Sequence, residues 1–183
     1  MQENTPIDNV LNDDGILFML KDIGVDPGRS AAHIHEFADK VAWIESDGNT
    51  KAENETSSAK GAYQWLTKGD ENAFQDDLNG AALYYKKSGT ETPEWITSAI
   101  ESNDPTALTP DESKKLFLFR MYRTAPNADL KKAYTGDKET QKDLYYTKHH
   151  TNPDEATIRR VESVYQPINE AVTQVATEEG EAA

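Results

Sequence analysis

The sequence contains no cysteine, so disulfide bonds and thiolate metal sites are excluded. No apolar run approaches the ~20 residues that a membrane-spanning helix needs, and we expect no membrane insertion. The sequence also shows no strand-like alternation with turn signals, no internal repeat, no glycine-rich phosphate loop and no serine–histidine–acid set. These absences favour a helical domain, and we expect it to need neither a metal nor another cofactor.

Basic residues are scarce. Lysine and arginine together number 19 against 33 aspartates and glutamates, which gives a formal net charge of -14. Such a surface repels phosphate backbones and anionic lipids, so nucleic-acid and membrane partners are disfavoured. The length of 183 residues suits one domain with its own core.

Apolar residues at helical spacing divide the chain into three parts. We expect a loose N-terminal segment over 1–13, a single domain over 14–166, and a C-terminal helix and acidic tail over 167–183. Pro167 is expected to break the last helix, and the tail from Glu178 onward is expected to be disordered. The fold class is all-α, with at most one small hairpin between Gly48 and Lys60.

Start and stop residues predict the individual helices. Asp14, Ser30 and Asn152 are the expected N-caps, and Thr109-Pro110-Asp111-Glu112 is a capping box with proline at the first helical position. The capping box begins an aromatic-rich segment that we expect to be the central buried helix. The first expected helix follows Asp14. The others are expected from Ser30 to Gly48, Asn72 to Lys87, Pro93 to Asn103, Pro110 onward, Asn127 to Tyr134, Lys138 to Tyr146, and Pro153 to Val164.

The stretch from Phe37 to Leu66 organises the rest of the chain. Its first part reads as an amphipathic helix stopped by Gly48, which leaves Glu45 in the final turn. The following loop to Lys60 is too polar for a core and suits the wall of a cleft. Glu45 is therefore a candidate acid catalyst, with a solvated surface glutamate as the alternative reading.

Elementary electrostatics predicts how Glu45 would ionise. A carboxylate is disfavoured at a helix C-terminus, and burial beside Trp43 or Tyr63 would desolvate it. Both effects raise the pKa of a carboxyl group. We therefore expect Glu45 to stay protonated near neutral pH, as a general acid must.

The same stretch resembles a known family. Glu45-Ser46, Asn49, Ala52, Ser57-Ser58 and Gly61-Ala62-Tyr63-Gln64 resemble the E-S…N…A…S…G-x-x-Q signature of soluble lytic transglycosylases, in particular the lysozyme-like modules of bacteriophage virion proteins. The resemblance implies a lysozyme-like fold with Glu45 as the catalytic residue. It further implies substrate contacts from Ser46, Ser58, Gly61, Tyr63 and Gln64.

The family also has a late tyrosine that lines the sugar cleft close to the glutamate. The usual Ala-Tyr-Asn-x-Gly string is absent, and either Tyr145 or Tyr146 is the candidate for that position, with packing in the core as the alternative. The nearby His149 and His150 can cap helices, bind substrate or have no chemical role. His33 and His35 are two residues apart, so on a helix they face different directions and do not share a metal.

The resemblance implies cleavage of the β-1,4 bond between N-acetylmuramic acid and N-acetylglucosamine in peptidoglycan, with a 1,6-anhydro product. Glu45 would act first as acid and then as base, without a metal. A hydrolytic muramidase is the alternative, and it would need a second carboxylate such as Asp47, Asp76 or Asp77. A structural virion component without activity is the third reading.

The expected setting is a phage particle whose protein acts on the host wall. Partners would be peptidoglycan glycan strands and other virion proteins. The first residues, Met1 to Pro6, lack the basic-then-apolar pattern of a signal peptide, so we expect delivery to the wall or periplasm by another route.

Overall fold

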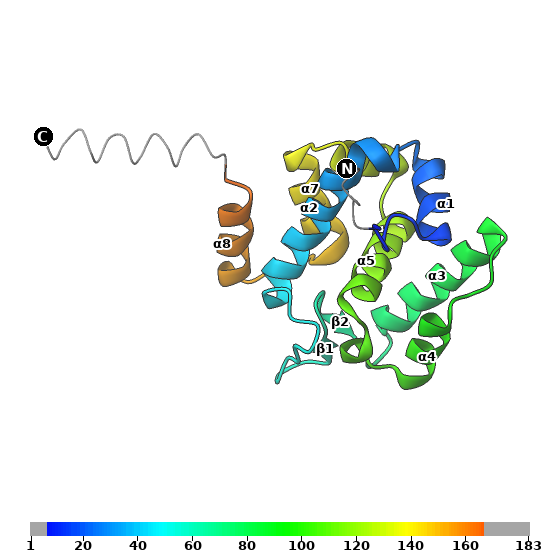
Figure 1. Cartoon of the computed structure of the whole chain (residues 1–183). Coiled ribbons are helices and arrows are strands. Elements are labelled where there is room, and N and C mark those ends of the chain that lie inside the picture. The colour runs from blue at the N-terminus through cyan, green and yellow to red at the C-terminus, as the bar shows by residue number, and fades with distance from the viewer. Residues whose placement is uncertain (1–6, 167–183) are drawn as a thin grey trace, which may run out of the picture.

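The computed structural model describes residues 7–166 (Figure 1). The calls on the first six residues and on the C-terminal helix and tail from 167 lie outside the described residues. Residues 7–13, expected to be loose, instead pack Val10 and Leu11 into the core, each at most 3% exposed. Asp8 holds this segment, because its carboxylate accepts hydrogen bonds from the N–H groups of both residues and contacts His35.

The described residues are mostly helical with one small antiparallel hairpin, which confirms the predicted all-α class with a hairpin. The α-helices are α1 (Asp14–Ile23), α2 (Pro27–Ser46), α3 (Ala73–Ser88), α4 (Glu94–Ser102), α5 (Pro110–Thr124), α6 (Asn127–Tyr134), α7 (Lys138–Leu144) and α8 (Glu155–Val164). A short 3-10 helix, η1 (Pro105–Ala107), precedes α5, and a π-helical turn, η2 (Tyr145–His149), follows α7.

Three of the predicted N-caps are wrong by one to four residues. The caps are Asp13, Asp26 and Asp154, whose carboxylates accept backbone N–H groups of the first turn. Pro27 fits the first turn of α2 because it has no N–H to satisfy, and Ser30 is instead a buried residue within that helix. The C-cap of α2 is Asp47, in the left-handed conformation, rather than Gly48.

Helix α5 lies at the centre of the fold, as its aromatic content predicted (Figure 1). Four successive residues, from Leu116 to Phe119, are at most 1% exposed. The ring of Phe117 stacks on that of Tyr63 at 4.6 Å and meets that of Phe37 edge-on at 5.6 Å. Helices α3 and α4 lie on one side of α5, and α2, α7 and α8 lie on the other.

The hairpin packs at one end of α2 and α5 (Figure 1). Its strands are β1 (Ala59–Lys60) and β2 (Trp65–Leu66), so only β1 lies in the predicted Gly48–Lys60 stretch, where an antiparallel bridge also joins Glu53 to Lys60. The turn between them begins at Gly61, whose φ of 80° is left-handed and whose α-carbon lies so near Pro105 that a methyl group would contact it at 3.0 Å. Within residues 7–166, no helix combines the length and the apolar character that crossing a membrane requires.

Candidate active site

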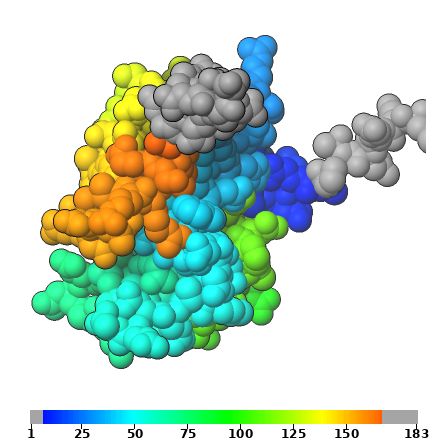
Figure 2. Space-filling view, turned by 90° about the vertical axis from the view of Figure 1, so that its left-hand side faces the viewer, coloured from blue at the N-terminus to red at the C-terminus, as the bar shows by residue number. Residues whose placement is uncertain are grey.

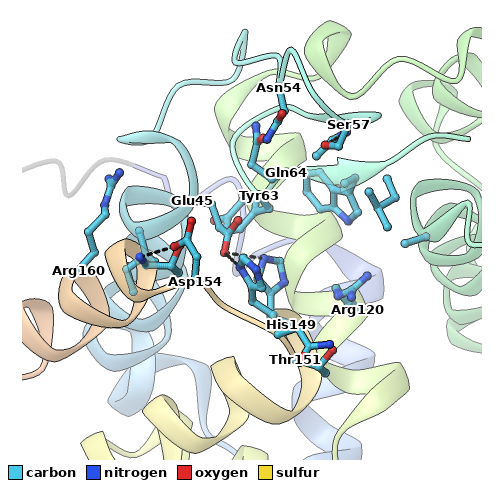
Figure 3. Close-up of a pocket in the computed structure, with 18 of the residues that line it drawn as sticks. Glu45, Asn54, Ser57, Tyr63, Gln64, Arg120, His149, Thr151, Asp154 and Arg160 are labelled. Carbon is cyan, nitrogen blue, oxygen red and sulfur yellow. Dashed lines mark hydrogen bonds and ion pairs between the residues drawn. The ribbon is translucent and has the colours of Figure 1, made fainter.

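A cleft of about 600 Å³ opens between the hairpin, the C-terminal end of α2 and the segment that runs from η2 into α8. In Figure 2 the orange segment and the cyan-to-green hairpin region meet on one face of the molecule. The cleft is lined mainly by polar side chains, among them Glu45, Asn54, Ser57, Gln64, Arg120, His149, His150, Thr151, Asn152, Asp154 and Arg160 (Figure 3).

Glu45 is the most constrained acid of the cleft. Its side chain is only 8% exposed, and its Oε1 atom accepts hydrogen bonds from the Tyr145 hydroxyl at 2.5 Å and from Nδ1 of His150 at 3.0 Å. The Oε2 atom has no hydrogen-bond partner among the described residues, yet it is not a fully buried atom. One oxygen is therefore held by the protein while the other keeps access to the cleft.

The π-helical turn η2 brings the partners of Glu45 together. The N–H of His150 donates to the carbonyl oxygen of Tyr145, five residues earlier, at 2.8 Å. Because a π-turn is wider than an α-turn, residues five apart come to lie on one side of it. The Tyr145 hydroxyl and Nδ1 of His150 are consequently 3.2 Å apart, and both reach the same carboxylate oxygen.

His149 contacts Glu45 from a different environment. Its side chain is 5% exposed and is surrounded by the rings of Tyr63, Phe117 and Tyr145. The Nε2 atom lies 3.9 Å from Oε1 of Glu45, and Figure 3 shows the carboxylate pointing toward this ring. Burial lowers the pKa of His149 to about 4 despite the opposing charge of Glu45, so the ring is neutral at pH 7.

The expectation that Glu45 stays protonated near neutral pH is wrong. Burial raises the pKa of Glu45, but the hydrogen bond from His150, a charge on His149 and the hydrogen bond from Tyr145 together lower it below its usual value. Because His149 is neutral above about pH 4, it carries no charge that could lower the pKa of Glu45 at neutral pH. The hydrogen bonds from His150 and Tyr145 are then the effects that lower it. The hydrogen bond to Glu45 in turn raises the pKa of His150 against its partial burial.

Two of the predicted substrate contacts line the cleft, and both are also tied to the protein. Gln64 has a φ of 52°, and its side-chain amide donates to the carbonyl oxygen of Gly61. Tyr63 is 2% exposed, and its hydroxyl donates to the carbonyl oxygen of Ala38. The amide nitrogen of Gln64 is thus bound to the protein, whereas Tyr63 offers only part of a packed ring.

The structure places Ser46, Ser58 and Gly61 outside the cleft lining. The Ser46 hydroxyl donates to the carbonyl oxygen of Ala62 at 2.8 Å, and the Ser58 hydroxyl accepts the N–H of Thr67 at 3.2 Å. Gly61 packs on Pro105 as described above. These three residues hold the hairpin in place, and they affect the cleft indirectly, by fixing the position of the hairpin that forms one of its walls.

The structure distinguishes the two late tyrosines. Tyr145 bonds directly to Glu45, but its side chain is fully buried and does not line the cleft, so it contacts the glutamate from within the packed core. Tyr146 does not line the cleft, and its buried hydroxyl has no hydrogen-bond partner within residues 7–166.

Several lining residues were not predicted from the sequence as site residues. Asn54 and Ser57 lie on the polar loop that was expected to form a wall, so composition could have found them. Arg120 lies on the helix predicted to be core, and its guanidinium bonds to the buried Asp77. His150 carried no signal beyond its position in a histidine pair, because its partner is 105 residues away.

Asp154 is the second acid of the cleft, and it was not among the predicted carboxylates. Of those, Asp47 pairs with Arg160 at 2.6 Å, Asp77 is fully buried between Arg120 and Arg123, and Asp76 is exposed on α3. None of these three lines the cleft. Residues 7–166 contain no group of three or more His, Cys, Asp or Glu side chains placed to hold a metal ion.

Comparison of the chain with protein-family models, with curated proteins and with solved structures finds no match.

Proposed function

We propose that the protein is a peptidoglycan lytic transglycosylase whose catalytic residue is Glu45. One observation carries the proposal: Glu45 is nearly buried in the wall of a polar cleft, with one carboxylate oxygen held by Tyr145 and His150 and the other open. The substrate, the bond between N-acetylmuramic acid and N-acetylglucosamine, rests on the resemblance of Glu45–Gln64 to the transglycosylase signature. The lysozyme-like fold and the virion setting are parts of the same proposal.

The open oxygen of Glu45 can serve both steps of the reaction. As the glycosidic C1–O bond breaks, Oε2 gives its proton to the leaving oxygen. The C6 hydroxyl of the muramic acid then attacks C1, and Oε2 takes up the hydroxyl proton as the 1,6-anhydro ring closes. The carboxyl group ends in the state in which it began, and no water is consumed.

The other lining residues suit a glycan. Asn54, Ser57 and Gln64 form one side of the cleft, and Thr151 and Asn152 contribute from the segment before α8. Short amide and hydroxyl side chains match the hydroxyl and N-acetyl groups of the sugars. Because the Gln64 amide nitrogen is bound to Gly61, its oxygen is the atom that would accept an N-acetyl N–H.

A hydrolytic muramidase is the second candidate, and Asp154 is the observation that favours it. Its Oδ1 accepts the N–H of Thr157 at 2.8 Å, and this backbone bond lowers the pKa of Asp154, so the carboxylate is ionised at neutral pH. An ionised acid in the same cleft can hold a water molecule or stabilise a sugar cation. The two candidates therefore differ in the role of one side chain.

Digestion of purified sacculi in heavy-oxygen water separates the candidates. We expect wild-type protein and Asp154→Asn to release anhydro-muropeptides without solvent label, because ring closure uses no water. Glu45→Gln should lose at least ~10²-fold in rate while keeping its melting temperature, since glutamine cannot transfer the proton. Asp47→Asn, at an exposed side chain that does not line the cleft, is the matched control and should keep most activity.

Two other outcomes would contradict the proposal. Labelled reducing ends whose formation depends on Asp154 would identify a muramidase. No release by the wild-type protein would favour the structural virion component.

A further inference from the structure

The ionisation of Glu45 conflicts with the role of an acid. In the free protein its carboxylate accepts two hydrogen bonds at Oε1, and both favour the charged form. A charged carboxylate has no proton to give. The proton for the first step must therefore be stored close to Glu45.

His150 is the group placed to store it. Its Nδ1 atom lies 3.0 Å from Oε1 of Glu45, and because the carboxylate can only accept, Nδ1 carries hydrogen in this bond. The side chain is 35% exposed and lines the cleft, whereas that of Glu45 is 8% exposed. The Nε2 atom has no protein partner among the described residues and is not fully buried, so it can exchange protons with water.

We propose that His150 is a positioning residue that keeps one proton on the Glu45–His150 pair at neutral pH, so that the two side chains act together as the acid of the proposed transglycosylase. This role rests on the function proposed above. It assigns the pair, rather than Glu45 alone, as the unit that must be protonated for the reaction to begin.

The two forms of the pair hold the same number of protons. In the empty cleft the proton is on Nε2 of His150, and the imidazolium faces the Glu45 carboxylate. When a sugar displaces water, the separated charges become less favourable, and the neutral form gains. The proton then leaves Nε2 and, through the remaining water, reaches Oε2 of Glu45.

The hydrogen bond between Nδ1 and Oε1 is kept in both forms. Oε1 therefore stays fixed while the proton arrives at Oε2, the atom that faces the cleft. After the glycosidic oxygen has taken this proton, Oε2 recovers one from the C6 hydroxyl, and the pair is ready for another turn.

The groups that face the pair from its own turn and from α5 do not exchange protons near neutral pH. Burial and the Glu45 charge raise the pKa of Tyr145 far above its usual value, so its hydroxyl stays protonated. His149 is neutral, since burial lowers its pKa to about 4. The positive charge of Arg120 on α5 adds to the lowering of the His149 pKa.

The remaining neighbours act as fixed charges. Asp154, before α8, is ionised and raises the pKa of His150 further. Arg160 on α8 pairs with Asp47 at the end of α2. Of the described residues that line the cleft from the hairpin side, Asn54, Ser57 and Gln64 are uncharged. Between pH 5 and 8, the Glu45–His150 pair is thus the group of the cleft that loses a proton.

The pH dependence of muropeptide release tests this role. We expect the wild-type rate to fall only above about pH 6.5, where the pair loses its proton. In His150→Gln the fall should begin at least about one pH unit lower, with activity retained in acid. At a pH where both rates are falling, the variant should therefore be at least ~10-fold slower than the wild type. His33→Gln, at a histidine that is 44% exposed and does not line the cleft, is the matched control, and its basic limb should coincide with that of the wild type.

Titration of the His150 ring by NMR gives a readout that does not depend on turnover. The midpoint should lie above about 6.5 in the wild type and fall in Glu45→Gln. An equal midpoint in the two proteins, or an active His150→Gln protein with an unmoved limb, overturns the role of His150 and leaves the proposed function standing. No release by the wild type at any pH overturns both.

Discussion

Individual residues around Glu45 differ sharply in their ionisation although they touch one another. His150 is half-buried and paired, and the hydrogen bond to Glu45 raises its pKa. His149, one position earlier, is enclosed by aromatic rings, and burial lowers its pKa to about 4. The pKa values of these two adjacent histidines are thus shifted in opposite directions.

His149 should make the fold sensitive to acid. An unfolded histidine has a pKa of about 6.5, so between 6.5 and about 4 the unfolded chain binds a proton that the folded chain does not. Stability contributed by neutral His149 is therefore complete above about 6.5 and is lost as the pH falls toward 4, by roughly 3 kcal/mol. His149→Phe, which keeps a ring in the aromatic surroundings, should lose less stability in acid than the wild type.

Urea unfolding of both proteins at about pH 7.5 and about pH 4.5 measures this difference. His33→Gln, at a histidine whose side chain is 44% exposed, controls for the loss of a histidine as such. Equal pH dependence in wild type and His149→Phe would contradict the assignment.

The sequence could locate Glu45 but could not predict its charge. Helical spacing and the following glycine place it in the last turn of α2, where it is found. Its charge is set by Tyr145 and His150, which are 100 and 105 residues away. Rules that use only the residues near a helix end take no account of such distant partners, and they predicted a protonated Glu45.

Among the secondary-structure elements, the helices were the most predictable and the caps less so. The capping box at Thr109 has both of its reciprocal hydrogen bonds, because threonine, proline and glutamate stand at fixed local spacing. Asp26 and Asp154 were missed as caps since Ser30 and Asn152 offered competing polar side chains nearby. The turn η2 spans only five residues, too few for a periodic pattern to reveal it.

The capping box should matter for stability and not for chemistry. Thr109 accepts the N–H of Glu112 at 3.2 Å, and the Glu112 carboxylate accepts the N–H of Thr109 at 2.9 Å, at a helix start outside the cleft. Thr109→Ala removes the first bond and should cost about 0.5–2 kcal/mol. Thr109→Ser keeps the hydroxyl and is the matched control.

Melting and wall cleavage measured on the same samples decide this point. Thr109→Ala should melt lower and cleave at the wild-type rate well below its melting temperature. Lost activity with unchanged melting would connect this helix start to the reaction.

For the whole molecule, the net charge of -14 governs how the protein meets its proposed substrate. Peptidoglycan carries carboxylates on its peptide stems, so encounter with sacculi is opposed by repulsion. Salt shortens the range of this repulsion from about 30 Å at 0.01 M to about 10 Å at 0.1 M. We expect the initial rate on sacculi to rise between about 10 mM and about 150 mM salt.

An uncharged oligosaccharide fragment of the glycan provides the comparison, because repulsion does not act on it. Its cleavage rate should change little over the same range of salt. A rate on sacculi that falls with added salt would instead reveal a basic docking surface.

The indole of Trp65 lies in the cleft lining, is 2% exposed, and donates to Asp77 at 2.9 Å. Trp43, in contrast, is 46% exposed and lies under the guanidinium of Arg160. Indole fluorescence shifts to longer wavelength in contact with water, so the two side chains emit in different parts of the spectrum. We expect a sugar in the cleft to alter the surroundings of Trp65, which lines it, more than those of Trp43, which does not. Tryptophan fluorescence can thus report ligand binding in the cleft even in a variant that does not cleave the ligand.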